Sequence, residues 1–112
     1  MQIVIKYTGF HMITPAIEAY VYQRVNSLEK NLRSFLRKGA INVFIEIAQT
    51  TRHHRHGNIF YAEGMLTLPG RTIRAIHTDL DIYTAIDNMK KKLKAEIRNY
   101  KGRVESKRRK LR

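Results

Sequence analysis

Four stretches of the chain have the pattern of strands, either by alternating side chains in the way that is typical of one buried face or by being rich in aromatic and aliphatic residues, as residues 59–68 are. In the first stretch, Ile3 and Ile5 alternate with Gln2, Val4 and Lys6. The other three stretches are residues 41–47, 59–68 and 72–78. The pattern therefore predicts four short strands, one at the start of the chain and three in its middle.

The segments that join the last three predicted strands differ in character. Residues Gln49 to Asn58 are polar and show no periodicity, which predicts a loop. The run Leu68-Pro69-Gly70-Arg71 places Pro and Gly where a type II turn needs them. We therefore expect the third and fourth strands to form a hairpin.

Two longer stretches repeat apolar residues every three or four positions, which predicts amphipathic helices. The first runs from about Pro15 to Leu36 and follows Thr14, a good capping residue. Its apolar positions are Ile17, Val21, Val25, Leu28, Leu32 and Leu36. The second begins at Asp79, a good N-cap candidate, and its apolar positions are Ile82, Ile86, Met89, Leu93, Ile97 and Tyr100.

The predicted order is strand, helix, three strands, helix. This order favours an α+β two-layer sandwich, β-α-β-β-β-α, with a four-stranded, mostly antiparallel sheet and two parallel helices on one face. At 112 residues the chain has room for one domain. We place that domain at residues 1–102 and expect residues 103–112 to form a basic C-terminal tail, either a frayed helix end or a disordered arm.

The charge balance of the chain gives the first indication of its function. The chain has 22 Lys and Arg against 9 Asp and Glu, a net charge of +13, which indicates a polyanionic partner. It has no cysteine, which excludes disulfides, thiolate zinc sites and a cysteine nucleophile. Since no apolar run approaches the roughly 20 residues of a spanning helix, we expect a soluble, cytoplasmic protein that does not enter a membrane.

The positive charge is concentrated near the C-terminus. Residues 88–112 contain seven Lys and five Arg against two Glu, a net charge of +10, which leaves +3 for the rest of the chain. At about 100° per residue, a stripe follows one flank of the second helix, with Lys91 just outside it and Lys92 on the opposite flank. The stripe consists of Lys90, Lys94, Arg98 and Lys101.

The first helix adds Arg24 near its apolar seam and Lys30, Arg33 and Arg37 on its outer face. Two parallel basic helices suit duplex or folded RNA, where phosphate contacts dominate. The alternatives are a solvated helix face and a membrane surface. A membrane would require the apolar face of the second helix, which the sheet also needs.

Two other groups of residues suggest chemistry. The predicted loop contains His53, His54 and His56, a tract that can ligate a transition metal. His77, followed by Asp79 and Asp81, could serve acid–base or magnesium-assisted chemistry. The histidine spacing fits no recognised zinc pattern, and the two aspartates suit a helix N-terminus. We therefore predict no catalytic site, no metal site and no cofactor.

The chain resembles the family of ribosome hibernation promoting factor and ribosome-associated inhibitor A from Met1 to about Lys101. The resemblance rests on the order and spacing of five segments. They are Met1-Gln2-Ile3-Val4-Ile5, Ile13-Thr14-Pro15-Ala16-Ile17, Leu28-Glu29-Lys30, Asp81-Ile82-Tyr83-Thr84-Ala85-Ile86-Asp87 and Lys91-Lys92-Leu93.

This resemblance implies a fold like that of double-stranded-RNA-binding domains, with an added first strand. It implies that the chain occupies the mRNA channel of the small ribosomal subunit, at the A and P sites, and blocks translation. Its partner would be that subunit and its 16S-type rRNA, and it would be monomeric when free. With the charge stripe, the expected rRNA-binding residues are Arg24, Lys30, Lys90, Lys91, Lys92, Lys94, Arg98 and Lys101.

Three features differ from the family pattern. Ser27 and Ala95 stand where some relatives carry a basic residue, and the tail is short and basic. Whether the protein promotes or prevents ribosome dimers therefore stays open. The alternative function is a duplex-RNA-binding module that acts on non-ribosomal RNA.

Overall fold

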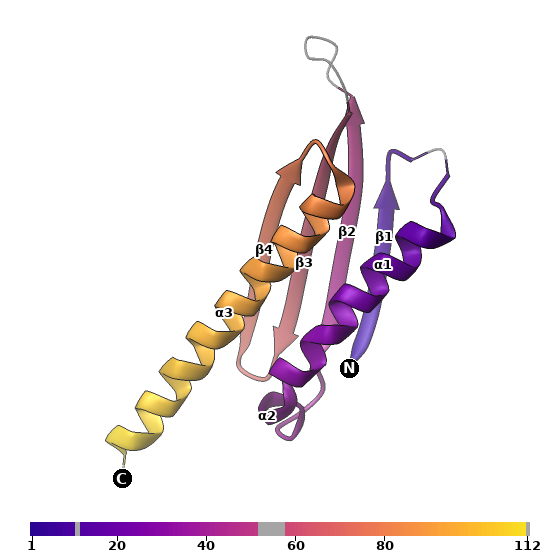
Figure 1. Cartoon of the computed structure of the whole chain (residues 1–112). Coiled ribbons are helices and arrows are strands. Elements are labelled where there is room, and N and C mark those ends of the chain that lie inside the picture. Colours follow the sequence, from indigo (N-terminus) through magenta and orange to yellow (C-terminus); the bar gives the residue numbers. More distant parts are fainter. Residues whose placement is uncertain (11, 52–57, 112) are drawn as a thin grey trace.

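The structure is a computed structural model that describes residues 1–10, 12–51 and 58–111. One sheet contains four strands in the order β1-β2-β3-β4, and two helices, α1 and α3, lie side by side on one of its faces (Figure 1). Short helical segments η1 and α2 follow α1. The elements are β1 Gln2–Thr8, α1 Pro15–Asn26, η1 Ser27–Asn31, α2 Arg33–Leu36, β2 Asn42–Thr51, β3 Asn58–Leu68, β4 Arg71–Asp79 and α3 Ile82–Lys110.

The pairing of the strands agrees with the predicted sandwich. Strand β1 pairs parallel with β2, whereas β2–β3 and β3–β4 are antiparallel. The two long helices run in the same direction, as predicted (Figure 1). Strands β2 and β3 extend into both ends of the predicted loop, and its histidines His53, His54 and His56 lie outside the described residues.

Helix α3 packs very closely on the centre of the sheet. One row of paired residues crosses the sheet, formed by Ile5, Ile45, Gly64 and Ala75. An ideal Cβ on Gly64 would lie 2.6 Å from Leu93 Cδ1 and 2.8 Å from Met89 Sδ. The predicted apolar seam of α3 is confirmed, because Ile82, Ile86, Met89, Leu93 and Ile97 are all buried.

The first predicted helix is interrupted, contrary to the expectation of one helix from Pro15 to Leu36. Regular α-helix ends at Asn26, and a 3₁₀ segment and one short helical turn follow it. The Ser27 hydroxyl donates to the Arg24 carbonyl oxygen at 2.6 Å. Serine and asparagine compete for backbone groups in this way, which weakens a regular helix. As a result Phe35 is buried in place of Leu36, which is half-buried.

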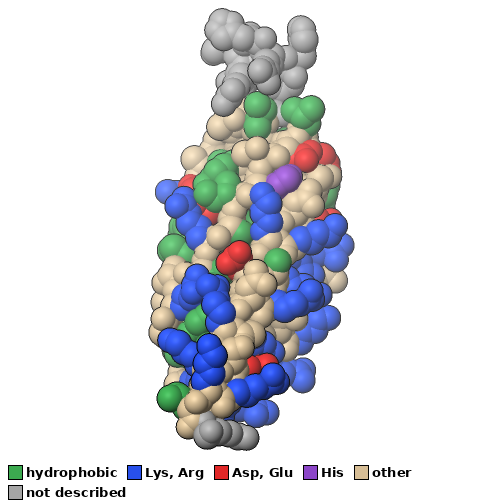
Figure 2. Space-filling view, turned by 90° about the vertical axis from the view of Figure 1, so that its left-hand side faces the viewer, with side chains coloured by type: hydrophobic (Ala, Val, Ile, Leu, Met, Phe, Trp, Pro, Cys, Tyr) green, Lys and Arg blue, Asp and Glu red, His purple; other side chains and the backbone are tan. Residues whose placement is uncertain are grey.

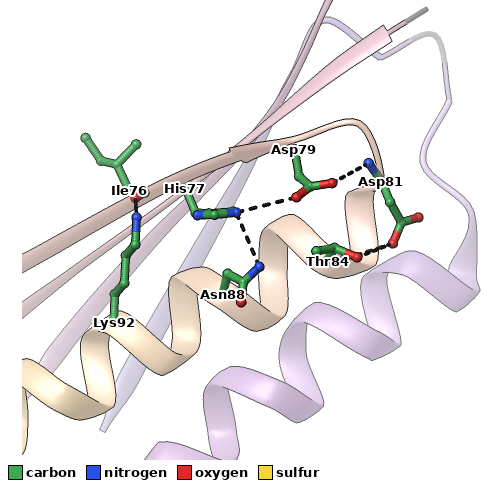
Figure 3. A network of polar contacts seen from close by, with 7 residues as sticks. All are labelled: Ile76, His77, Asp79, Asp81, Thr84, Asn88 and Lys92. Atoms are coloured by element: carbon green, nitrogen blue, oxygen red, sulfur yellow. Dashed lines mark hydrogen bonds and ion pairs between the residues drawn. The ribbon is translucent and has the colours of Figure 1, made fainter.

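The N-cap of α3 lies two residues later than predicted. Asp81 is the N-cap, because its Oδ2 accepts from the Thr84 N–H at 3.0 Å. Hydrogen bonds from Thr84 lower the pKa of the Asp81 carboxyl. Asp79, the predicted cap, instead accepts from the Asp81 N–H at 3.1 Å (Figure 3). The carboxylate of Asp79 therefore supports the turn that precedes the helix.

Two polar contacts fasten the first turns of α3 to β4. His77 Nε2 lies 3.3 Å from Asn88 Nδ2 and 3.5 Å from Asp79 Oδ2. One helical turn further on, Lys92 Nζ donates to the Ile76 carbonyl oxygen at 2.8 Å (Figure 3). These contacts assign His77 and Asp79 to holding the helix on the sheet, which agrees with the structural role preferred from the sequence.

Helix α3 does not end near Gly102, where the tail was predicted to fray or become disordered. It continues as helix to Lys110. Its C-terminal end projects past the β3–β4 turn (Figure 1). The molecule is accordingly elongated, with extents of 58 × 27 × 17 Å and a radius of gyration of 16.0 Å. A compact domain of this length would have a radius of gyration of roughly 13 Å.

The close approach at Gly64 yields a test of the packing. Gly64→Ala should lower the free energy of unfolding by about 1–3 kcal/mol, because the added methyl group overpacks the core beneath α3. Gly102→Ala is the matched control, since a Cβ there meets nothing within 4 Å. That change should stabilise the protein by about 0.5–1 kcal/mol through helix propensity. Urea unfolding measures both, and equal stability of the two variants would contradict the packing described.

Candidate nucleic-acid interface

Basic side chains cover the surface formed by α3 and the C-terminal end of the molecule. Figure 2 shows Lys and Arg side chains along the helix side and over the lower part of the face, with few Asp and Glu among them. The few acidic side chains on this face are scattered, and one group of them lies beside a histidine (Figure 2). The charge asymmetry seen in the sequence is therefore also an asymmetry in space.

Four of the predicted binding residues meet where α1 and η1 lie beside α3. Burial lowers the pKa of Lys90, and the positive charges of Arg24, Lys94 and Lys30 lower it further. Asp87 raises it, but less than the other effects lower it. Since like charges act on a pKa in this way only at close range, these side chains form one group. We call Arg24, Lys30, Lys90 and Lys94 the basic cluster.

A set of aromatic and charged contacts positions Arg24 at this junction. The Tyr20 hydroxyl donates to Asp87 Oδ1 at 2.7 Å, which links α1 to α3. Burial, and then this hydrogen bond, raise the pKa of Tyr20. The Arg24 guanidinium lies 4.7 Å above the Tyr20 ring, and its Nε is 3.4 Å from Asp87 Oδ1. The Tyr20 ring also packs edge-to-face on Tyr83, with centroids 4.8 Å apart.

These contacts were not found from the sequence. The rings of Tyr20 and Tyr83 pack against each other in the structure. The hydrogen bond between Tyr20 and Asp87 joins residues 67 positions apart, and no local pattern signals such a pair. Arg24 Nε has no hydrogen-bond partner among the described residues, although the side chain is 43% exposed. The link between Arg24 Nε and Asp87 is therefore an ion pair without a hydrogen bond.

The other predicted binding residues lie outside the basic cluster. Lys91 and Arg98 are exposed on the outer side of α3. Lys101 is half-buried and lines a hollow between α3 and α2. Lys92 lies on the opposite flank, as predicted, and its ammonium group is bound to the Ile76 carbonyl of β4. Lys92 is therefore the member of the predicted set whose charge is partly used within the protein.

The uncovered face of the sheet differs from the helix face, because its charges pair with each other. Arg74 forms an ion pair with Glu63, and the Tyr61 hydroxyl donates to the same carboxylate at 3.1 Å. The Thr8 hydroxyl donates to Glu46 at 3.0 Å. Neutralised charges of this kind attract a polyanion weakly. Among the described residues, the excess positive charge therefore belongs to the helices.

Other kinds of site find no support in the described part of the chain. Within residues 1–10, 12–51 and 58–111, no group of three or more His, Cys, Asp or Glu could hold a metal ion. The prediction about the histidine tract lies outside these residues. No helix in the same ranges is long and apolar enough to cross a membrane.

Residues 3–105 match the family described as Sigma 54 modulation protein / S30EA ribosomal protein. The chain belongs to this family. A curated relative, the ribosome hibernation promotion factor of Lactococcus lactis subsp. cremoris (strain MG1363), is 31% identical over 98 residues. The match covers 85% of this chain but 47% of the relative, so the chain spans about half the length of that protein. The predicted family is confirmed.

Two solved structures share the fold. The N-terminal domain of Protein Y from Thermus thermophilus is 24% identical with a TM-score of 0.65, and the match covers 89% of this chain and 99% of that one. A ribosomal subunit interface protein from Coxiella burnetii is 25% identical with a TM-score of 0.64, over 91% and 99% of the two chains. The predicted α+β class is confirmed. The family is not an enzyme family, in agreement with the prediction of no catalytic site.

The electrostatics of the basic cluster can be tested in the free protein. Arg24→Gln should raise the pKa of Lys90, because it removes a neighbouring positive charge, whereas Asp87→Asn should lower it further. An NMR pH titration of the Lys90 side chain measures both shifts. Arg98→Gln serves as the control and should leave the pKa unchanged. A Lys90 pKa that is the same in all three variants would show that the charges do not meet there.

Proposed function

We propose that this protein is a ribosome hibernation factor that binds the small ribosomal subunit through its basic helices and blocks translation sterically. The observation that carries the proposal is the basic cluster, in which four cations from α1, η1 and α3 surround a single carboxylate, Asp87. Membership of a ribosomal protein family supports the ribosome as the target. The name of the Lactococcus lactis relative supports hibernation as the purpose.

Electrostatics explains why such a cluster needs a polyanion. Holding Arg24, Lys30, Lys90 and Lys94 together costs repulsion in the free protein, and this repulsion adds to burial in lowering the pKa of Lys90. RNA phosphates would remove this repulsion and release their own counterions. Base readout is not required, because phosphate position and groove shape dominate the recognition of folded RNA. The cluster is therefore suited to a rigid RNA surface such as 16S-type rRNA.

The mechanism needs no catalysis and no cofactor. A rigid, elongated domain bound in the mRNA channel, at the A and P sites, would exclude mRNA and tRNA by occupying their space. That location follows the resemblance noted in the sequence and the subunit-interface protein of Coxiella burnetii that shares the fold. We place the protein in the cytoplasm, as a monomer when free.

Co-sedimentation with ribosomes and isolated subunits at two salt concentrations tests the target, with in vitro translation as the functional measurement. Binding to the small subunit should weaken steeply with salt, by about 0.9 in log affinity per log unit of salt for each phosphate contacted. Translation should fall as the protein is added. Equal affinity for a simple RNA duplex and for the small subunit would favour the alternative, a module for non-ribosomal RNA.

Charge-reversal substitutions test whether the basic helices form the surface that binds the small subunit. Replacement of Lys91, Lys92 and Lys94 by Glu should abolish binding to the small subunit, while circular dichroism shows an intact fold. Single reversals provide a matched comparison, because Lys94→Glu and Lys6→Glu change the net charge equally. Lys94→Glu should weaken binding roughly tenfold or more, since a charge-assisted contact contributes about 1.5–3 kcal/mol. Lys6 lies on the uncovered sheet face, and an equal loss in both variants would argue against the assigned surface.

A further inference from the structure

The helical end of α3, residues 101–111, has features that the basic cluster does not explain. We call this segment the basic arm. It carries six Lys and Arg against one Glu, and it leaves the sheet as a continuation of a 29-residue helix. Four of these basic residues follow one another directly, from Lys107 to Lys110. The segment is therefore a rigid extension with a dense charge.

Tyr100, the residue just before the basic arm, has packing contacts on both sides. The Tyr100 ring stacks on Phe35 of α2, with centroids 5.4 Å apart and planes at 12°. The Arg71 guanidinium, from the β3–β4 turn, lies 5.4 Å from the centroid of the same ring. Tyr100 is thus held between α2 and the turn just before the helix projects. The direction of the arm is consequently set by the fold.

A hollow lies on each side of the arm, and each is lined by four cationic side chains. The first, of about 220 Å³, lies between α3 and α2, and its cations are Arg37, Lys38, Lys101 and Arg108. The second, of about 580 Å³, lies beside the β3–β4 turn, and its cations are Arg71, Arg103, Lys107 and Arg108. Glu105 is the acidic residue among the described residues that line the first hollow. Both hollows are therefore positively charged.

We propose that the basic arm binds the phosphates of a second RNA segment, separate from the one at the basic cluster. This inference rests on the proposed function and extends it from one RNA contact to two. Lys90 and Arg108 are 18 residues apart on one helix, a distance of about 27 Å, so one phosphate cannot reach both. The chain would then bridge two segments of a folded RNA.

The distribution of charge around the helix favours RNA over a lipid surface. At about 100° per residue, Lys107, Arg108, Arg109 and Lys110 are spread around the helix, with Lys107 and Lys110 as neighbours on one side. A membrane-bound helix needs one continuous apolar face and its basic residues on the other. An arm that is basic on all sides instead suits a position between RNA strands, where phosphates approach it from more than one direction.

Two double variants test whether the basic arm contacts RNA phosphates. Lys107→Gln with Arg108→Gln should reduce the slope of log affinity against log salt by about 1.4–1.8, because two phosphate contacts are lost. Lys6→Gln with Arg74→Gln removes the same charge from the uncovered sheet face and should leave the slope unchanged. Gln retains helix propensity, and circular dichroism checks the fold. An unchanged slope in the arm variant, or an equal change in both pairs, would overturn the inference.

The measurements use both small ribosomal subunits and a purified structured RNA with a hairpin and a single-stranded end. If the wild-type protein binds subunits and the arm variant keeps the full slope, the arm inference fails and the proposed function stands. If the wild-type protein does not bind subunits, the proposed function fails, and the structured RNA still decides whether the arm contacts phosphates.

Cross-linking provides a readout that does not depend on affinity. A photoreactive amino acid in place of Ser106 lies on the arm, and one in place of Ala95 lies beside Lys91 and Arg98. The two positions should cross-link to different nucleotides of the bound RNA, and identical cross-links would contradict two separate contacts. Vesicles of phosphatidylserine and phosphatidylcholine supply the remaining comparison. Loss of vesicle binding in the arm variant, with RNA binding intact, would assign the arm to a membrane.

Discussion

The close packing of α3 on the centre of the sheet is the constraint on which the rest of the structure depends. Gly64 leaves no room for a Cβ against Leu93 and Met89, so α3 packs closely on β3 at this residue. Burial of the seam from Ile82 to Ile97 then fixes the rotation of the helix about its axis. The direction in which each basic residue of α3 points is therefore fixed by the packing of the apolar residues.

The packing of α3 brings together charges that would separate in solution. Lys90 and Lys94 face Arg24 and Lys30 because both helices must cover the same face of one sheet. Tyr20 and Asp87 stabilise this arrangement by joining the two helices with a hydrogen bond of 2.7 Å. Core burial and this link offset the repulsion of the cluster, which stays available for an anionic partner.

The two faces of the sheet therefore have different electrostatic characters. On the uncovered face, Arg74 is neutralised by Glu63, whereas on the helix face the four cations of the basic cluster share one carboxylate, Asp87. The same helix that supplies half of the cluster also carries the basic arm, with Tyr100 held between Phe35 and Arg71 at its root. A single element thus links core packing, the proposed rRNA contact and the proposed second contact in one rigid body.

The sequence by itself determined the elements, their order and the location of the excess charge. Period and composition are local properties, so the strands, the α3 seam and the +10 charge of residues 88–112 could all be read directly from the sequence. Local patterns misplaced some boundaries: Ser27 interrupts the first helix through a side-chain bond, Asp81 replaces Asp79 as the cap, and α3 continues past Gly102.

Only the tertiary structure decided which basic residues meet. Arg24 and Lys90 are far apart in the chain, and their proximity depends on the packing of two helices on a shared sheet. The same reason separates Lys92 from its sequence neighbours, because its flank of α3 faces β4 and its ammonium group reaches the Ile76 carbonyl. Helical periodicity gives the angle of a side chain about its own axis, but its neighbours across an interface follow from long-range packing.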